Sequence, residues 1–360
     1  MKENSSDRRD LVAATRLVDE SGLKNRIIEF FTKWEVLLAI IFVLVFIVFG
    51  SITPKFLRLK NLLNQSGTFM EKSIMALPMI FIIMCGDIDI SVASIVALSG
   101  FGIGMAAESG APTIVLVLIG LGIGVACGLV NGLLVTGLNM PAIAVTLATQ
   151  SIFRGISKGV LGEHACTKYP ESFMFFGQGT IGGTRIPFSL LLYVILAVIM
   201  FFVLQRTVYG RRLYAIGSCA EAARFSGIKV RRAKILNFAL MGLFCGIAAI
   251  LLSSRICSVR SNIADGYDME VITLVVLGGV AITGGKGTVY GVVISSFLVG
   301  FLKFGLTLLK VSGTYQTIAV GALLIIAVLL PRMLDMFKAN RKLARQQAQA
   351  KLEESQIFAK

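Results

Sequence analysis

Long apolar runs, each close to the thickness of a lipid bilayer, constrain this chain more than any other feature of its sequence. A helix that crosses the hydrocarbon core needs about 20 predominantly apolar residues. The chain is 56% hydrophobic and 15% charged, whereas a soluble domain is about 25% charged. The sequence therefore predicts an all-α polytopic membrane protein with about ten transmembrane helices. The predicted spans are Glu35–Ile52, Leu62–Gly86, Ile90–Ala107, Thr113–Gly137, Pro141–Ile156, Phe188–Leu204, Ile235–Ser254, Val271–Thr283, Thr288–Leu309 and Tyr315–Leu330.

Lysine and arginine are concentrated in a few segments between the apolar runs. Most of the 35 basic residues lie in residues 1–33, 205–234 and 332–360. Cytoplasmic loops of membrane proteins retain such residues, so both termini are expected in the cytoplasm. The enrichment of basic residues in cytoplasmic segments then explains the net charge of +15, and no nucleic-acid partner is expected. We expect a cytoplasmic tail over 1–33, a transmembrane domain over 34–331 with a cytoplasmic loop at 205–234, and a second tail over 332–360.

Two aspartates interrupt the apolar sequence in CGDIDISVAS, residues 85–94. A charge at bilayer depth costs several kcal/mol. These carboxylates are therefore expected either to lie in a turn outside the hydrocarbon core or to have a function. With Gly86 as a helix breaker, the stretch fits a turn between two spans, in which Asp89 and Ser91 cap the next helix. Alternatively, Asp87 or Asp89 belongs to a gate or a partner contact on the inner side. The residues alone leave both interpretations open.

A few polar side chains fall inside the predicted spans. A buried amide or hydroxyl in lipid must find a hydrogen-bond partner. Such residues either hold helices together or line a path for a polar solute. The candidates for the path are Asn64, Gln65, Asn131, Thr146, Gln150 and Thr273.

Glycine spacing in the run GLGIGVACGLVNG predicts a close helix contact. Gly120, Gly124 and Gly128 recur every four residues and therefore share one helix face, where small residues let two backbones approach. Two other stretches, IIMCGDIDISVASIVAL and VVLGGVAITGGKGTVYGVVI, are faintly alike. Both are apolar runs interrupted by glycine and polar residues, as in transporters built from duplicated halves with broken helices.

The basic segment 207–234 contains SCAEAARFSGI, which predicts a short helix. Ser218 would cap it, Glu221 lies in its first turn and Gly227 would end it. An isolated helix of this length is marginal in water. It therefore needs a surface to bind, either a partner protein or the membrane surface.

Several catalytic chemistries are excluded by what the sequence lacks. It contains no P-loop pattern of the GxxxxGKS type, so any use of ATP must come from another polypeptide. His164 is the only histidine, and we expect it to be a solvated surface residue. The six cysteines show no CxxC spacing, and a disulfide between Cys166 and Cys257 is left open.

Four stretches identify a family that the chain resembles. They are GDIDISVASIVALSG, YGRRLYAIGSCAEAARFSGIKV, GYDMEVITLVVLGGVAITGGKGTVYG and GTYQTIAVGALLIIAV. Together they resemble the monosaccharide-type ABC-transporter permeases, the ribose, xylose, arabinose and autoinducer-2 group, from about Asn61 to Leu330.

The resemblance implies a permease dimer, identical or mixed, in a bacterial inner membrane. It implies a cytoplasmic ABC ATPase subunit and a periplasmic or extracellular solute-binding protein as partners. ATP and Mg²⁺ would bind the ATPase, with no cofactor on this chain. The family's coupling helix corresponds to Glu221, Ala222, Ala223, Arg224, Ser226 and Gly227.

The chain departs from the family pattern in ways that bear on the solute. Asp87 and Ala93 stand where glycine is usual, Cys219 stands at an Asn-like position, and Thr273 and Leu274 replace small residues. A permease for a branched-chain amino acid or a nucleoside therefore remains an alternative. An ion-coupled secondary transporter is a further one, with Asp87 and Asp89 as its support, and a membrane enzyme is disfavoured.

Overall fold

The computed structural model describes residues 34–326 together with residues 329, 333 and 336. The chain divides into two units, Phe42–Val328 and a second unit of Met1–Ile41 with Leu329–Lys360. The second unit is described only for Trp34–Ile41, which begin helix α2, and for three helical residues near the C-terminus. The predicted tails 1–33 and 332–360 therefore lie outside the described residues, apart from Met333 and Met336.

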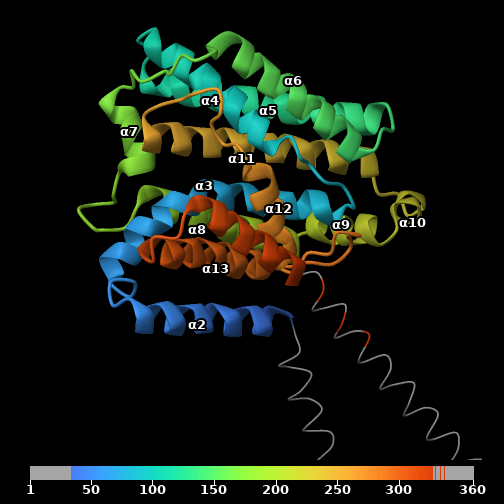
Figure 1. Cartoon of the computed structure of the whole chain (residues 1–360). Helices are drawn as coiled ribbons and strands as arrows, with labels where there is room; N and C mark the ends of the chain where they lie inside the picture. Colours follow the sequence, from blue (N-terminus) through green and yellow to red (C-terminus); the bar gives the residue numbers. More distant parts are fainter. Residues whose placement is uncertain (1–33, 327–328, 330–332, 334–335, 337–360) are drawn as a thin grey trace, which may run out of the picture. The chain divides into compact units, whose positions relative to one another are not determined.

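The described residues are organised as α-helices, with isolated β-bridges at Cys166/Val259 and Thr180/Pro187 and no strand among them (Figure 1). The predicted all-α class is thus confirmed. The helices are α2 (Trp34–Ile52), α3 (Leu59–Met84), α4 (Val92–Glu108), α5 (Thr113–Gly137), α6 (Ala142–Leu161), α7 (Glu171–Gln178), α8 (Phe188–Arg206), α9 (Val208–Ser218), α10 (Ala220–Phe225), α11 (Val230–Ile256), α12 (Tyr267–Leu277) and α13 (Val289–Leu308), followed by an apolar helix Gly313–Ile326.

Six of these helices are long and apolar enough to cross a bilayer, namely α2, α3, α5, α8, α11 and α13. Helix α5 has the bounds that the sequence predicted. The predicted eighth span, Val271–Thr283, is wrong as a single helix, because α12 ends at Leu277. Its 11 residues extend only about 16 Å, against a hydrocarbon core of about 30 Å. The glycine-rich segment that follows, residues 278–288, is not helical.

Proline marks the start of four helices. Pro112, Pro141, Pro170 and Pro187 are the residues that immediately precede α5, α6, α7 and α8. Proline has no N–H to donate, and the first N–H groups of a helix have no partner within that helix. Each proline therefore sits where its missing donor costs nothing, and the sequence specifies these boundaries locally.

Two helices were missed from the sequence. Helices α7 and α9 lie in segments expected to be loops. In α9, Arg211 and Arg212 obscure an apolar face formed by the buried side chains of Leu213 and Ile216. Thr207 begins this helix by accepting a hydrogen bond from the N–H of Gly210.

The predicted glycine contact joins α5 to α11, which is the most extensive helix pair of the unit. A Cβ atom added at Gly242 would lie 3.0 Å from Gly128 Cα and would overlap the Gly124 carbonyl oxygen. The two backbones thus touch, as the four-residue spacing predicted. Helix α3 lies at the centre of the unit and is buried for most of its length. In contrast, α8 exposes apolar residues such as Val194, Ile195 and Phe202, as a lipid-facing helix would.

The connections gather at two opposite ends of the helices in unit Phe42–Val328. One end is formed by residues 85–91, the α5–α6 turn at 138–141, α9, α10 and residues 278–288, and we call it the Asp87 end. At the other end, the His164 end, Glu108 contacts His164, and Cys166 pairs with Val259. The structure thus brings residues 85–91, the α5–α6 turn and residues 278–288 to the same end as the segment 205–234, which the sequence predicted to be a cytoplasmic loop.

Candidate functional site

The turn between α3 and α4 contains a buried polar cluster. Gly86, at φ +78, ends α3 in a conformation that favours glycine. Asp89 is fully buried, and its Oδ1 accepts hydrogen bonds from the Ser91 N–H at 2.9 Å and the Ser91 hydroxyl at 2.6 Å. Asn131 of α5 donates to the Ser91 hydroxyl at 2.7 Å. Ser91 immediately precedes α4, but its side chain makes no capping bond to that helix, so the predicted Ser91 cap is wrong.

A second carboxylate in the same turn is held by an ion pair. Asp87 lies 2.8 Å from the Lys234 ammonium of α11, and both side chains are largely buried. Burial raises the pKa of Asp87, and Lys234 opposes the rise. The pair ties the turn to the start of α11. Sequence reasoning identified Asp87 but missed Lys234, because 147 residues separate the two.

The two interrupted stretches that looked alike in the sequence meet at this end. The N–H of Gly285 donates to the carbonyl oxygen of Met84, the last residue of α3, at 3.0 Å. Helix α9 packs on both stretches. Gly217 of α9 lies so close to Met84 O and Gly285 N that a Cβ atom there would overlap both, and the Tyr214 hydroxyl donates to Gly287 O at 2.7 Å. We call this contact the α9 junction.

Helix α10 follows α9 directly and is the short helix that the sequence predicted. Its cap was assigned wrongly, because Ser218 ends α9 and Cys219 is the residue before α10. Gly227, at φ +81, lies just beyond its C-terminal end, as expected. Within the helix only Ala223 is buried, and Phe225 is 91% exposed. Of the six predicted coupling residues, the other five are all exposed: Glu221, Ala222, Arg224, Ser226 and Gly227.

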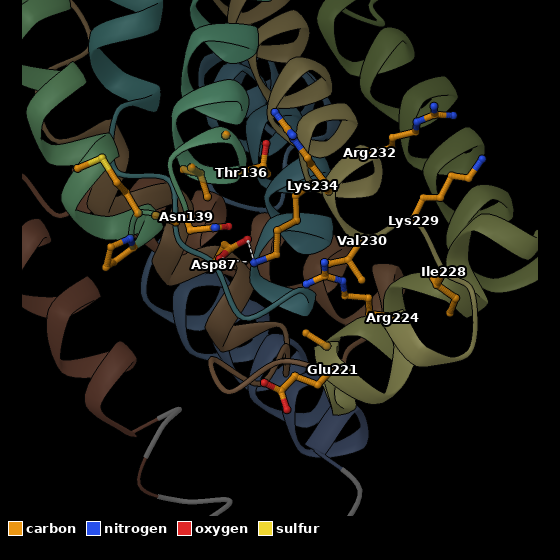
Figure 2. A pocket seen from close by; sticks show the side chains of 17 residues that line it. Asp87, Thr136, Asn139, Glu221, Arg224, Ile228, Lys229, Val230, Arg232 and Lys234 are labelled. Atoms are coloured by element: carbon orange, nitrogen blue, oxygen red, sulfur yellow. Dashed lines mark hydrogen bonds and ion pairs between the residues drawn. The ribbon is translucent and has the colours of Figure 1, made fainter.

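A basic pocket of about 860 Å³ opens between α10, the start of α11 and the α5–α6 turn. Figure 2 shows Lys234 reaching Asp87 within it, and Glu221 and Arg224 projecting to different sides of α10. The acidic groups lining it are Asp87 and Glu221. The basic groups lining it are Arg224, Lys229, Arg231, Arg232 and Lys234. The pocket is thus positive and lies beside the predicted coupling residues.

The predicted path residues lie at separate places. Asn64 is exposed, and the side chain of Gln65 donates to the Thr68 hydroxyl, one turn away. Asn131 and Thr146 are buried at the turn, where the Thr146 hydroxyl lies 3.3 Å from Ile88 O. Gln150 donates to Asp268 at 3.3 Å, and the Thr273 hydroxyl bonds to Met269 O in its own helix. Each of these hydrogen bonds also stabilises the packing within a helix or between helices. A role of these residues in solute transfer therefore stays a prediction.

An ionic network lies among α3, α11, α12 and α13. Arg255 lies 2.6 Å from Glu71, and Glu270 accepts from both Lys72 at 2.7 Å and Lys303 at 2.8 Å. The Lys72 ammonium also lies 4.3 Å from the centre of the Tyr267 ring. Because charges inside a membrane protein need partners, this network explains how Glu71 and Lys72 are tolerated in the middle of α3. The sequence showed these charges but not their pairing.

The buried position of Asp89 makes stability depend on pH. Burial raises the pKa of Asp89 to about 6, above the unfolded value of about 3.9. Protonation therefore favours the folded state, and this contribution is full below about pH 4 and lost as pH rises through 6, roughly 3 kcal/mol in all. We expect Asp89→Asn to flatten the fall in thermal stability between pH 4 and pH 7, measured by unfolding in detergent. Glu163→Gln, at an exposed carboxylate, should keep the wild-type slope, and an unchanged slope in Asp89→Asn would contradict the assignment.

Comparison with known proteins identifies the family. A family model described as "Branched-chain amino acid transport system / permease component" matches residues 61–328. The ribose import permease protein RbsC of Bacillus subtilis is 37% identical over 294 residues, which cover 81% of this chain and 90% of that protein. The autoinducer 2 import system permease proteins LsrD of Photorhabdus laumondii and of Escherichia coli are 32% and 33% identical over 301 residues, 82% of this chain and 90% and 91% of theirs. No solved structure matches the chain significantly. The chain therefore belongs to the branched-chain amino acid transport system permease family, and its similarity to the ribose and autoinducer 2 permeases agrees with the monosaccharide-type resemblance of its motifs.

Proposed function

We propose that this chain is the membrane-spanning permease subunit of an ABC importer for a monosaccharide or a sugar-like solute. The relatives named above are a ribose permease and autoinducer 2 permeases. ATP hydrolysis belongs to a separate ATPase subunit that holds ATP and Mg²⁺. This chain crosses a bacterial inner membrane about ten times, with both termini and the Asp87 end in the cytoplasm.

The observation that carries this proposal is the placement of α10. Its exposed side chains, Phe225 above all, lie beside the basic pocket at the end where the two interrupted stretches meet. A short helix that projects an aromatic side chain into solvent offers an anchor for a partner protein. The partner that fits a transporter without its own P-loop is an ATPase.

The α9 junction supplies a route from the ATPase to the spans. Movement of α10 would be passed to α9, since Cys219 alone separates them. Because Gly217 touches the backbones of Met84 and Gly285, α9 cannot shift without displacing the end of α3 or residues 278–288. Such a shift would alternate access between the two sides of the membrane.

The partners are an ABC ATPase, a second permease subunit and a solute-binding protein that delivers the solute at the His164 end. Two alternatives are kept. The description of the matching family favours a branched-chain amino acid. The buried carboxylates Asp87 and Asp89 would favour ion coupling. Asp87 is paired with Lys234, and Asp89 Oδ1 accepts from Ser91. Asp89 Oδ2 has no hydrogen-bond partner among the described residues, so this oxygen is where a transported ion would bind.

Uptake into proteoliposomes tests the proposal. We expect the chain, reconstituted with its ATPase and binding protein, to take up a labelled monosaccharide only when ATP is supplied on the cytoplasmic side. Labelled leucine should not accumulate. Uptake by the chain alone in response to an H⁺ or Na⁺ gradient would refute the proposal. ATP-dependent accumulation of leucine would show that the chain is a permease for branched-chain amino acids instead.

A further inference from the structure

Three side chains with metal-binding atoms converge at the His164 end, away from the site described above. They are Glu108 at the end of α4 and His164 and Cys166 in the segment between α6 and α7. His164 Nε2 lies 2.9 Å and 3.0 Å from the two carboxylate oxygens of Glu108. The ligand atoms of all three residues, the Cys166 sulfur included, lie within 4.8 Å of one another.

A fourth polar group lies beside this cluster without a partner of its own. Tyr169 is 92% buried, being only 8% exposed, and its hydroxyl makes no hydrogen bond within the described structure. A Cβ atom added at Gly104 of α4 would lie 3.1 Å from the Cys166 sulfur and 3.3 Å from the Tyr169 hydroxyl oxygen. The buried hydroxyl and the thiol therefore both border this one position beside Gly104. A buried polar group usually has a partner, so its lack of one points to a ligand.

The chemistry of these donors selects a borderline-soft divalent cation. Thiolate, imidazole and carboxylate are the three side-chain ligands of Zn²⁺, at about 2.3, 2.0 and 2.1 Å from the metal. Tetrahedral angles at those lengths separate the ligand atoms by about 3.5 Å. The present arrangement therefore needs only small side-chain movements, and His164, whose side chain is 59% exposed, is free to make them. Magnesium and calcium prefer oxygen ligands throughout.

We propose that Glu108, His164 and Cys166 bind a zinc ion, with the Tyr169 hydroxyl or a water completing the coordination. The site joins the end of α4 to the α6–α7 segment. Through the bridge between Cys166 and Val259, it also joins the segment that connects α11 to α12. Zinc would accordingly fasten the connections at the His164 end to one another.

Titration of the purified full-length chain with ZnCl₂ tests this. The background carries Cys219→Ser, which removes an exposed thiol at the Asp87 end. We expect one zinc ion per chain, a rise in the thermal unfolding midpoint on binding, and an affinity reduced at least 100-fold in Cys166→Ser and in His164→Gln. That factor follows because even outer-shell partners of a metal are worth about 10–100-fold. Cobalt(II) should give a sulfur-to-metal absorption band that Cys166→Ser abolishes.

The controls separate a built site from casual binding by thiols and acids. Glu163→Gln changes an exposed carboxylate beside the cluster, and Cys127→Ser changes a thiol that lies on α5 outside it. Both should keep the parent affinity. Because His164 is exposed, His164→Gln should fold normally, so its result can be interpreted even if Cys166→Ser does not fold. Unchanged affinity in His164→Gln, or zinc binding only at millimolar concentrations, would show that Glu108 and His164 form an ordinary ion pair.

Discussion

Gly128→Leu should prevent the chain from reaching its folded state in the membrane. A Cβ atom at this position would lie 3.0 Å from the carbonyl carbon of Phe238 and 3.1 Å from Gly242 Cα, and would overlap the Phe238 carbonyl oxygen. These atoms belong to the backbone of α11, which cannot turn aside as a flexible side chain does. Adding methylenes to an ordinary packed core costs about 1–3 kcal/mol, and here two helices must separate along their main contact. We expect almost no monodisperse protein on size-exclusion chromatography in detergent.

Gly122→Leu is the matched control for this prediction. Gly122 lies on the same helix, six residues earlier, and nothing stands within 4 Å of the position of its added Cβ. The substitution adds the same side chain to α5 with the same gain in helix propensity over glycine. We expect wild-type yield and thermal stability. If Gly128→Leu also yields wild-type levels of folded protein, the close approach of α5 and α11 is not as described.

Phe225→Ala should uncouple the permease from its ATPase without destabilising the permease itself. Because Phe225 is 91% exposed, its truncation removes little internal packing, and surface changes of this kind are usually within about 0.5 kcal/mol. As the aromatic anchor of a docking helix it would contribute about 2 kcal/mol or more to the complex, which is about a 30-fold loss of affinity. At an ATPase concentration about ten times the wild-type dissociation constant, ATP-driven uptake should fall to about a quarter of the wild-type rate.

Phe202→Ala provides the comparison for Phe225. Phe202 is also a strongly exposed phenylalanine, at 54%, but it lies within α8, a helix apolar enough to cross the membrane. It should leave both the affinity for the ATPase and the uptake unchanged. The dissociation constant of the purified subunits, with thermal unfolding of each variant as a folding check, distinguishes the two positions. Equal ATPase affinity for wild type and Phe225→Ala would mean that α10 does not anchor the partner.

The sequence by itself determined the features that arise from local composition and periodicity. Apolar runs predicted the helical membrane class and the bounds of α5, glycine spacing predicted a close helix contact, and Gly227 predicted the end of α10. The prediction of helices succeeds because every backbone N–H and C=O group of a span must be hydrogen-bonded within the protein when lipid surrounds it. The family motifs added the six coupling residues, five of which are exposed in the structure.

Only the tertiary structure decided which distant groups meet. Lys234 pairs with Asp87, Arg255 with Glu71, and Gly217 touches Met84 and Gly285, although no local pattern distinguishes these partners from other residues of their type. The end of α12 at Leu277 and the cluster around His164 were missed for the same reason. The role of a charge or a glycine in one segment depends on the backbone and side chains of the segments that pack against it. A single sequence does not show which segments those are.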